Sequence, residues 1–359
     1  MKVSIIIPIY NVAPYIEACL QSVFNQTYKD IEIIIIDDCG TDNSMEIAEK
    51  IVSAYNGEFC IKILHHNQNK GLSAARNTGI KRATGEYIFF LDSDDTLPNN
   101  SIYELIQQAI KYPDVSFVIG GIKTTGYRVY DYPLLYKEYL NKQETIISDY
   151  LLHKWNEMAC NKLISHKFII EHKLFFLENS FHEDLDFTFR LALLSKSMAC
   201  CYTNTYNYLT RKGSITTNKI LKNYLDEYNI ITNNISLITN LSTTQLSPET
   251  ITNYIINTCY SYIIHLLKNK NSNIKIKEKK TLTQKVAILS QKSPQKPKGI
   301  FIIKKIYIQL PFSLKLFITF ICNHTIFRQD THLNLTYLCA VTFNNNDYGK
   351  RKSKLPGGI

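Results

Sequence analysis

The segment Ile31 to Ile36 constrains the fold more than any other part of the chain. It is an apolar run bounded by acids, the pattern of a strand that is buried on both faces of a sheet. Up to about residue 120, further β-rich runs alternate with helical patterns, as in a mostly parallel sheet covered by helices. These runs are Val3 to Ile7, Ile61 to Leu64, Tyr87 to Leu91 and Val115 to Ile119. The sequence therefore predicts an α/β fold for the first part of the chain.

Helices are expected between these strands. Apolar residues at helical spacing predict helices over residues 16–24, 99–111 and 185–194. Asn43 or Ser44 is expected to cap a further helix. The segment from Gly71 to Gly79 opens another helix with small residues and one arginine, Arg76.

The length and the cysteines limit the class of protein. A chain of 359 residues forms one large domain with an appendage, or two modest domains. Its nine cysteines are scattered and show no CxxC pair or zinc-type spacing, which indicates a reducing cytoplasm. The first apolar run is short and contains Pro8, so we expect a strand there rather than a signal peptide. No uncharged apolar run approaches the roughly 20 residues that a membrane-spanning helix needs.

The positive charge is concentrated in the second part of the chain. Residues 1–215 carry 21 basic and 25 acidic side chains, whereas residues 216–359 carry 20 basic and 6 acidic ones. From residue 216 the composition shifts to Asn, Ile, Lys and Thr at helical spacing. We therefore expect an α/β domain over residues 1–215 and a basic, mainly helical region over residues 216–359.

This basic region has two candidate environments. Lysine and asparagine without a recognition motif do not indicate nucleic acid, so no nucleic-acid partner is expected. The apolar stretch from Ile300 to Cys322 is bracketed by basic residues, namely Lys304, Lys305, Lys315 and Arg328. Such a stretch suits the anionic inner face of a cytoplasmic membrane, or it forms a solvated helical appendage.

Acidic residues follow two of the predicted strands. Asp92, Asp94 and Asp95 come directly after an apolar strand, where carboxylates suit a hard divalent cation that also binds phosphate oxygens. Such a cation would neutralise a departing diphosphate. Asp37 and Asp38 end another strand, and one of them would accept hydrogen bonds from a base or ribose. The alternative at each place is a turn or an acidic helix cap.

Two further groups complete the candidate site. In the acidic segment His182 to Asp186, a single carboxylate would act as a general base, and a single base without a covalent intermediate implies inversion at the anomeric carbon. An acid-rich helix N-terminus is the alternative. Arg76 is either a diphosphate contact or a surface arginine on a packed helix. Dinucleotide-binding and ATP-loop glycine motifs are absent from the sequence.

Taken together, these segments resemble glycosyltransferase family 2. The resemblance rests on Val3-Ser4-Ile5-Ile6-Ile7-Pro8-Ile9-Tyr10-Asn11, Ser22 to Thr27, Asp37-Asp38, Gly71 to Gly79, Gly85-Glu86-Tyr87 and Leu91 to Asp95. Their order and spacing match over roughly residues 2–100. Further matches are Asn161-Lys162-Leu163, Glu183-Asp184, and Tyr208 with Arg211 to Ile215. One departure is Cys39-Gly40, where the family commonly has Gly-Ser, and this swap changes which residue of the turn can adopt positive φ.

The resemblance implies a GT-A fold and an inverting transfer of a hexosyl or N-acetylhexosaminyl group from a UDP-sugar. It also implies Mn²⁺ or Mg²⁺ as cofactor, and a saccharide or lipid-linked saccharide acceptor in bacterial polysaccharide or lipo-oligosaccharide assembly. Residues 1–100 would form the nucleotide-sugar and metal half, and residues 101–215 the acceptor half.

The family's functional positions can be carried over to this sequence. Pro8 and Tyr10 would line the base pocket, with Asp38 hydrogen-bonded to the base. Asp92 would contact the ribose or the metal, Asp94 would ligate the metal, and Asp95 would support it. Asp184 would be the catalytic base. Arg76 and Arg211 are candidate phosphate contacts.

Two other functions remain open. Asp92 to Thr96 also matches the DxDxT pattern of haloacid-dehalogenase-like phosphohydrolases, in which the first Asp is the nucleophile. That family has the motif on its first strand, whereas here about ninety residues precede it. The second alternative is a glycosyltransferase-like subunit that binds without turnover, although all three acidic clusters are present.

Overall fold

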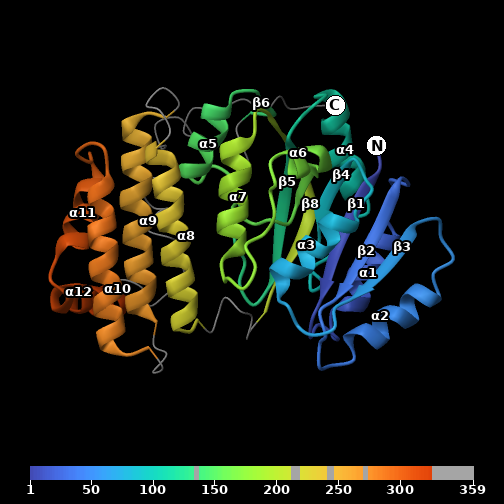
Figure 1. The fold of residues 1–359 in the computed structure, drawn as a ribbon, viewed down its shortest axis with the longest axis horizontal. Coiled ribbons are helices and arrows are strands. Elements are labelled where there is room, and N and C mark those ends of the chain that lie inside the picture. Colours follow the sequence, from blue (N-terminus) through green and yellow to red (C-terminus); the bar gives the residue numbers. More distant parts are fainter. Residues whose placement is uncertain (133–136, 212–218, 241–245, 270–273, 326–359) are drawn as a thin grey trace, which may run out of the picture. The chain divides into compact units, whose positions relative to one another are not determined.

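The computed structural model describes residues 1–132, 137–211, 219–240, 246–269 and 274–325, without the side chains of residues 321–325 (Figure 1). The chain divides into two compact units, Met1–Leu237 and Ile238–Ile359. Helix α8 (Leu221–Asn240) spans this division. The expected boundary at residue 215 marks the change in composition, and as a domain boundary it stays a prediction.

A single mixed sheet organises the first unit. Within the described part of the chain its eight strands are ordered β3-β2-β1-β4-β7-β5-β8-β6. The pairs β1–β2, β2–β3, β1–β4 and β5–β8 are parallel, whereas β7 is antiparallel to both neighbours and β6 is antiparallel to β8. The strands are β1 (Val3–Ile9), β2 (Ile31–Asp37), β3 (Cys60–His65), β4 (Tyr87–Phe90), β5 (Phe117–Gly126), β6 (Tyr139–Leu140), β7 (Lys162–Ser165) and β8 (Met198–Thr210). This sheet confirms the predicted α/β class with mostly parallel pairing.

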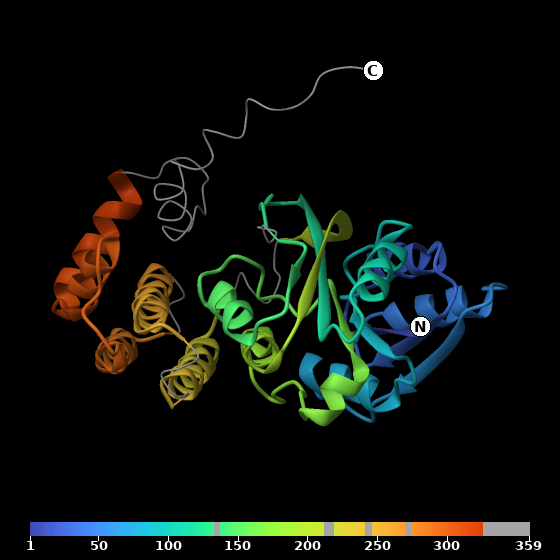
Figure 2. The same cartoon turned by 90° about the horizontal axis from the view of Figure 1, so that it is seen from above.

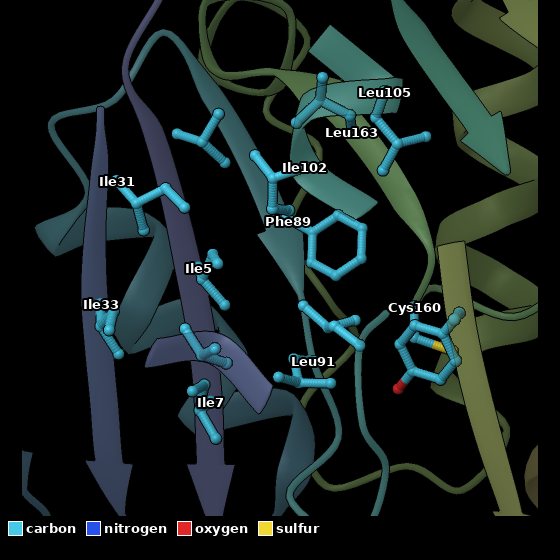
Figure 3. Packing of buried hydrophobic residues seen from close by; sticks show 14 of the residues in the cluster. Ile5, Ile7, Ile31, Ile33, Phe89, Leu91, Ile102, Leu105, Cys160 and Leu163 are labelled. Atoms are coloured by element: carbon cyan, nitrogen blue, oxygen red, sulfur yellow. The ribbon is translucent and has the colours of Figure 1, made fainter. Parts of the chain in front are cut away.

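Helices cover the sheet. They are α1 (Ile16–Phe24), α2 (Ser44–Ser53), α3 (Leu72–Arg82), α4 (Ser101–Lys111), α5 (Gln143–Leu151), α6 (His166–Glu171) and α7 (Glu183–Leu194). Ile5 and Ile7 of β1 lie in one buried cluster with Ile102 of α4 (Figure 3). Ile6 points the other way, against α3, where a side chain at Gly79 would come within 2.4 Å of it. Alternate residues of β1 thus pack against helices on opposite faces, which explains the apolar runs in the sequence.

The expected elements of residues 1–120 are all present. The strands differ from their predicted bounds by a few residues, most of all at β5, which begins at Phe117 and extends to Gly126. The predicted cap differs in detail. Asn43 precedes α2 without a side-chain capping bond, and the Ser44 hydroxyl instead accepts a hydrogen bond from the Val12 N–H at 2.8 Å.

A buried carboxylate joins the strands at the amino edge of the sheet. Glu32 is fully buried near the start of β2 and accepts hydrogen bonds from the Ser4 hydroxyl, Lys62 Nζ and the backbone N–H groups of Thr84 and Gly85. Burial alone would raise the pKa of Glu32, but these hydrogen bonds lower it to about 2. Its charge is therefore fully compensated.

The second unit consists of helices. These are α9 (Pro248–Lys268), α10 (Ile276–Leu289), a 3₁₀ turn (Ser290–Lys292), α11 (Ile300–Gln309) and α12 (Phe312–Thr325). Helix α9 packs against α10, α11 and α12. The helical C-terminal region is thereby confirmed over its described residues (Figure 2). Among the helices that the structure describes, none combines the length and the apolar character needed to cross a membrane.

Candidate active site

The functional side chains predicted from the sequence gather at the carboxyl edge of the sheet. Asp37 ends β2 and Asp38 follows it, while Asp92 comes just after β4. Strand β1 lies between β2 and β4, so all three strand ends face the same edge. This is the edge at which open α/β sheets bind ligands.

Arg76 brings together acids from two distant segments. Its guanidinium lies 2.7 Å from Asp92 Oδ1, 2.9 Å from Asp184 Oδ1 and 3.1 Å from Glu183 Oε1. The side chain is only 1% exposed and lies over the ring of Phe176 at 5.0 Å. The surface position considered from the sequence is therefore wrong. The guanidinium fork faces carboxylates, and contact with phosphate stays a prediction.

The electrostatics of this group follow from its burial. Burial would lower the pKa of Arg76, but Asp92, Asp184 and Glu183 raise it well above its usual value. Burial raises the pKa of Glu183 to about 7, and the neighbouring Asp184 adds to this while Arg76 opposes it. The positive charge of the Arg76 guanidinium thus stabilises three neighbouring carboxylates, which would otherwise repel one another.

The loop after β4 contains two further acids, Asp94 and Asp95, which contact Arg211 and residues of β8. Arg211 Nε donates to Asp94 Oδ2 at 2.6 Å, and its guanidinium lies 5.2 Å from the centre of the Tyr15 ring. Asp95 is buried and accepts hydrogen bonds from the Tyr206 hydroxyl at 2.8 Å and from the Leu209 N–H at 2.7 Å. Asp95 therefore fixes the loop to β8, and Arg211 faces Asp94.

The acids of this loop carry more negative charge than their neighbours compensate. Burial and the nearby Asp92 raise the pKa of Asp94, against the effect of Arg211. Burial, together with Asp92 and Asp94, raises the pKa of Asp95 to about 8. With Glu183 and Asp184, five acids face two arginines. Such an excess fits a divalent cation, which would stabilise the ionised carboxylates.

A complete metal cage is not preformed. Over the residues that the structure describes, no three His, Cys, Asp or Glu side chains form a ligand group. Oxygen donors are nevertheless available at Asp92 and Asp94, which are 25% and 21% exposed. One or two carboxylates suffice for Mg²⁺ when substrate phosphates supply further ligands. The donor set fits a cation that arrives with a diphosphate.

Asp38 is placed differently from the other acids. It is buried, and its carboxylate accepts hydrogen bonds from the N–H groups of Lys70 and Gly71, both at 2.8 Å, and lies 2.7 Å from His66 Nδ1. Gly71 has φ +85°, a conformation that favours glycine, and it begins helix α3. Asp38 therefore anchors the start of the helix that carries Arg76. Its hydrogen bond to a base stays a prediction.

The segments beside Asp38 form an open surface at the end of β1. Pro8 is buried within β1, and Tyr10 just beyond the strand is 47% exposed. In the turn after Asp38, the residue with positive φ is Cys39, at 54°, rather than Gly40. Its thiol donates to the His66 carbonyl at 2.7 Å. The exposed ring of Tyr10 is available for stacking.

The structure thus joins some predicted residues and not others. Asp92 and Asp184 meet at Arg76, and Asp94 meets Arg211, whereas the Asp38 carboxylate bonds to His66, Lys70 and Gly71 instead. Lys212 to Ile215 lie outside the described residues. The sequence did not indicate that Glu183 contacts Arg76, that His66 contacts Asp38, or that Tyr206 contacts Asp95. Glu183 stood next to the proposed base and His66 at a strand end, but nothing in the sequence marked Tyr206.

Comparisons with known proteins identify the family of the chain. Residues 4–173 match the model of glycosyl transferase family 2. The chain is 32% identical over 242 residues to UDP-Glc:alpha-D-GlcNAc-diphosphoundecaprenol beta-1,3-glucosyltransferase WfaP of Escherichia coli, covering 64% of this chain and 85% of that one. It is 32% identical over 223 residues to glycosyltransferase GlyA of Streptococcus pneumoniae, covering 60% of this chain and 31% of GlyA. The chain spans 30–62% of the length of GlyA and three other curated relatives.

The fold has solved counterparts. The structure of S. aureus TarS residues 1–349 in complex with UDP-GlcNAc matches with a TM-score of 0.68 at 20% identity, covering 82% of each chain. This likeness shows the GT-A fold. The chain belongs to glycosyl transferase family 2.

Proposed function

We propose that this chain transfers a sugar, with inversion, from a UDP-sugar to an acceptor hydroxyl. The observation that carries the proposal is the meeting of Asp92 and Asp184 on the buried guanidinium of Arg76. Asp92 follows the strand that leads to the proposed donor side, and Asp184 lies in the first turn of helix α7. Their meeting suits a transferase, because the acceptor hydroxyl must be held against the anomeric carbon of the donor, opposite the leaving diphosphate.

Asp184 is proposed as the general base. Its side chain is 31% exposed, against 16% for Glu183, so it is the more accessible carboxylate of the two. Asp184 would take the proton of the acceptor hydroxyl as that oxygen attacks the anomeric carbon. The bond from that carbon to the diphosphate oxygen breaks at the same time, and UDP leaves. A single displacement of this kind inverts the anomeric centre.

The donor would lie along the carboxyl edge of the sheet. We propose that Pro8, Tyr10 and Asp38 contact the base and that Asp92 contacts the ribose or the cation. Asp94 would ligate Mn²⁺ or Mg²⁺, with Asp95 as its support, and the cation would stabilise the charge of the departing diphosphate. Arg211, and Arg76 to a lesser extent, would add positive charge near the phosphates. The UDP-GlcNAc complex of TarS and the UDP-Glc in the name of WfaP support a UDP-sugar with a hexosyl or N-acetylhexosaminyl group.

The acceptor is proposed to be a saccharide or a lipid-linked saccharide. The name of WfaP contains a diphosphoundecaprenol-linked acceptor, which supports assembly of a bacterial polysaccharide or lipo-oligosaccharide. Such acceptors are held in a membrane. We therefore propose that the enzyme works in the cytoplasm, peripherally bound at the inner face of the membrane.

Replacing the proposed base tests the function. Asp184→Asn should lower turnover by about 10²-fold or more, the usual effect of removing a general base, while UDP binding with Mn²⁺ persists. Glu183→Gln is the matched comparison and should lower turnover less. The donor is first identified by metal-dependent protection of the wild-type chain against thermal unfolding by a panel of nucleotide sugars. Unchanged turnover by Asp184→Asn excludes this residue as the base. UDP binding without turnover by the wild-type chain on any acceptor favours the non-catalytic subunit.

A further inference from the structure

Helices α11 and α12 expose apolar side chains and bury polar ones. The exposed set is 58–63% accessible and comprises Ile303, Ile306, Phe317 and Phe320. The buried set is 3–4% accessible and comprises Lys304, Lys315 and Thr319. In a helix surrounded by water the apolar side faces the protein and the charged side faces the solvent. This helix pair departs from that arrangement, although Tyr307 and Ile308 of α11 are buried together with the polar set.

Specific contacts fix this orientation. Lys304 Nζ donates to Asn257 Oδ1 of α9 at 2.5 Å and lies 5.5 Å from the centre of the Tyr260 ring. The hydroxyls of Tyr307 and Thr319 lie 2.6 Å apart, which ties α11 to α12. The polar side of the pair is thus used within the unit. A rotation of either helix that buried the apolar side would break these contacts.

The apolar side of the pair also borders a cavity. It has a volume of about 280 Å³ and is lined by Tyr260, by Ile300, Ile303, Lys304, Ile306 and Tyr307 of α11, by Leu310 just after α11, and by Ile318 of α12. A hydrocarbon surface at this side would cover Ile303 and Ile306, which line the cavity. Apolar patches of this kind mark interaction sites rather than ordinary surface.

The charge and the helix lengths favour one kind of partner. Residues 238–325 contain 13 lysines and two acids, a net charge of +11. Helices α11 and α12 have 10 and 14 residues, too few to cross a bilayer, which takes roughly 20. Short helices with an apolar side in a lysine-rich unit lie in the plane of an anionic membrane surface.

We propose that the exposed apolar side of α11 and α12, defined by Ile303, Ile306, Phe317 and Phe320, docks on an anionic lipid bilayer. These side chains enter the boundary between headgroups and acyl chains, and the net positive charge of the unit attracts the anionic headgroups. The inference deepens the proposed function, on which it rests, by naming the surface that holds the enzyme near a lipid-linked acceptor.

Vesicle co-sedimentation of the full chain tests the proposal. Vesicles of phosphatidylcholine with about one third phosphatidylglycerol are compared with pure phosphatidylcholine, at low and high salt. The wild-type chain should sediment with the anionic vesicles at low salt and much less with the neutral ones. The double variant Ile303→Ser with Phe317→Ser should bind at least tenfold more weakly, because two apolar side chains that insert into the bilayer are lost. Ile110→Ser is the matched control, since this residue is 51% exposed on α4 of the other unit, and it should bind like wild type.

Two outcomes would overturn the proposal. The first is a wild-type chain that ignores anionic vesicles at low salt. The second is a double variant that binds as well as wild type. Light scattering without vesicles identifies a competing occupant, because a dimer that the double variant dissociates would show that a second copy covers this side. UDP binding, measured in the same samples without lipid, reports on the proposed function independently of the membrane result.

Discussion

Glu32 and Arg76 are buried charged residues with different surroundings at the two edges of the sheet. Arg76 gathers Asp92, Glu183 and Asp184 at the carboxyl edge of the sheet, where the acids remain in excess. Glu32 lies buried near the amino edge with hydrogen bonds on both carboxylate oxygens. The excess of acids around Arg76 would bind a cation. The hydrogen-bonded network around Glu32 contributes to stability.

Glu32 makes the stability of the first unit dependent on pH. Its folded-state pKa of about 2 lies below the ordinary value of 4.5, so ionised Glu32 stabilises the fold above that value. This contribution is lost as the pH falls from about 4.5 towards 2. We expect Glu32→Gln to lower the free energy of unfolding by on the order of 2 kcal/mol near neutral pH. The loss is smaller than the full pKa shift implies, because the lysines that pair with Glu32, Lys2 and Lys62, are 35% exposed and solvent screens their charge.

Urea unfolding between about pH 7 and pH 3 measures the effect. The difference between wild type and Glu32→Gln should shrink as the pH falls. Glu86→Gln, which changes a carboxylate 64% exposed near the same edge, is the control and should leave the curve almost unchanged. A constant difference at all pH values would contradict the assignment to ionised Glu32.

At the residue scale the sequence pointed to candidate acids but not to their contacts. Asp92, Asp94 and Asp184 were singled out by the order and spacing of the family's segments, because acids at strand and helix ends also fit turns and caps. The burial of Arg76 was not predictable, because its partners Glu183 and Asp184 are more than one hundred positions away. Asp38 was recognised as an acid at a strand end, yet the N–H groups of Lys70 and Gly71 that surround it carry no side-chain signal.

At the scale of elements, helix α8 positions the loop that leads to the proposed base. Asp226 Oδ2 accepts a hydrogen bond from the Phe181 N–H at 3.0 Å, and Lys222 Nζ donates to the Asn179 carbonyl at 2.8 Å. Lys222 also lies 5.2 Å from the centre of the Phe181 ring. This loop ends at His182, which precedes the first residue of α7, Glu183, and has a φ of 63°. Helix α8 therefore sets the direction in which α7 begins.

Removing this support should slow turnover without affecting the donor. We expect Asp226→Ala to lower kcat about tenfold or more while the KM for the nucleotide sugar changes little, because the base is displaced but the edge with Asp92 is not. Asp226→Asn keeps an acceptor oxygen for the Phe181 N–H and should retain most activity. Glu171→Ala, which removes an exposed surface pair with Lys167, serves as control. Equal loss of donor affinity in Asp226→Ala would indicate general misfolding instead.

The sequence predicted the elements unevenly. Strands β1, β2 and β4 were legible because they are buried on both faces and read as apolar runs. Strand β3, at the edge of the sheet, is only partly buried, and its short apolar run identified it. Strand β7 has only four residues, among them the buried Lys162, so its pattern does not identify it. The second half of β8 alternates polar and aromatic residues over an irregular register with β5, and the register shifts depend on contacts far along the chain. Local pattern carries no information of that kind.

At the scale of the whole molecule, the division into two compact units predicts two unfolding events. Only the unit Met1–Leu237 contains the proposed donor site. We expect calorimetry of the full chain to show two transitions and UDP with Mn²⁺ to raise the midpoint of one of them, because a ligand stabilises the unit that binds it. UDP without metal should shift it less. A single transition that moves as a whole would show that the units unfold together.

The fold and family were predictable at this scale because the motifs lie in order along the first part of the chain. The division within α8 was not, since the composition changes at residue 216 whereas Phe181 and Asn179 hold the start of that helix in the first unit. The inverted orientation of α11 was also hidden. An alternation of lysine and isoleucine shows that a helix has two sides, but not which side its neighbours cover.

The separation of the two edges of the sheet has a practical consequence. Substitutions that reinforce the packing around Ser4, Glu32 and Thr84 alter thermal tolerance at a place remote from the donor. Changes of sugar preference can then be sought at the opposite rim without first weakening the scaffold. An engineer who wishes to retarget this enzyme can therefore stabilise it first and diversify it afterwards.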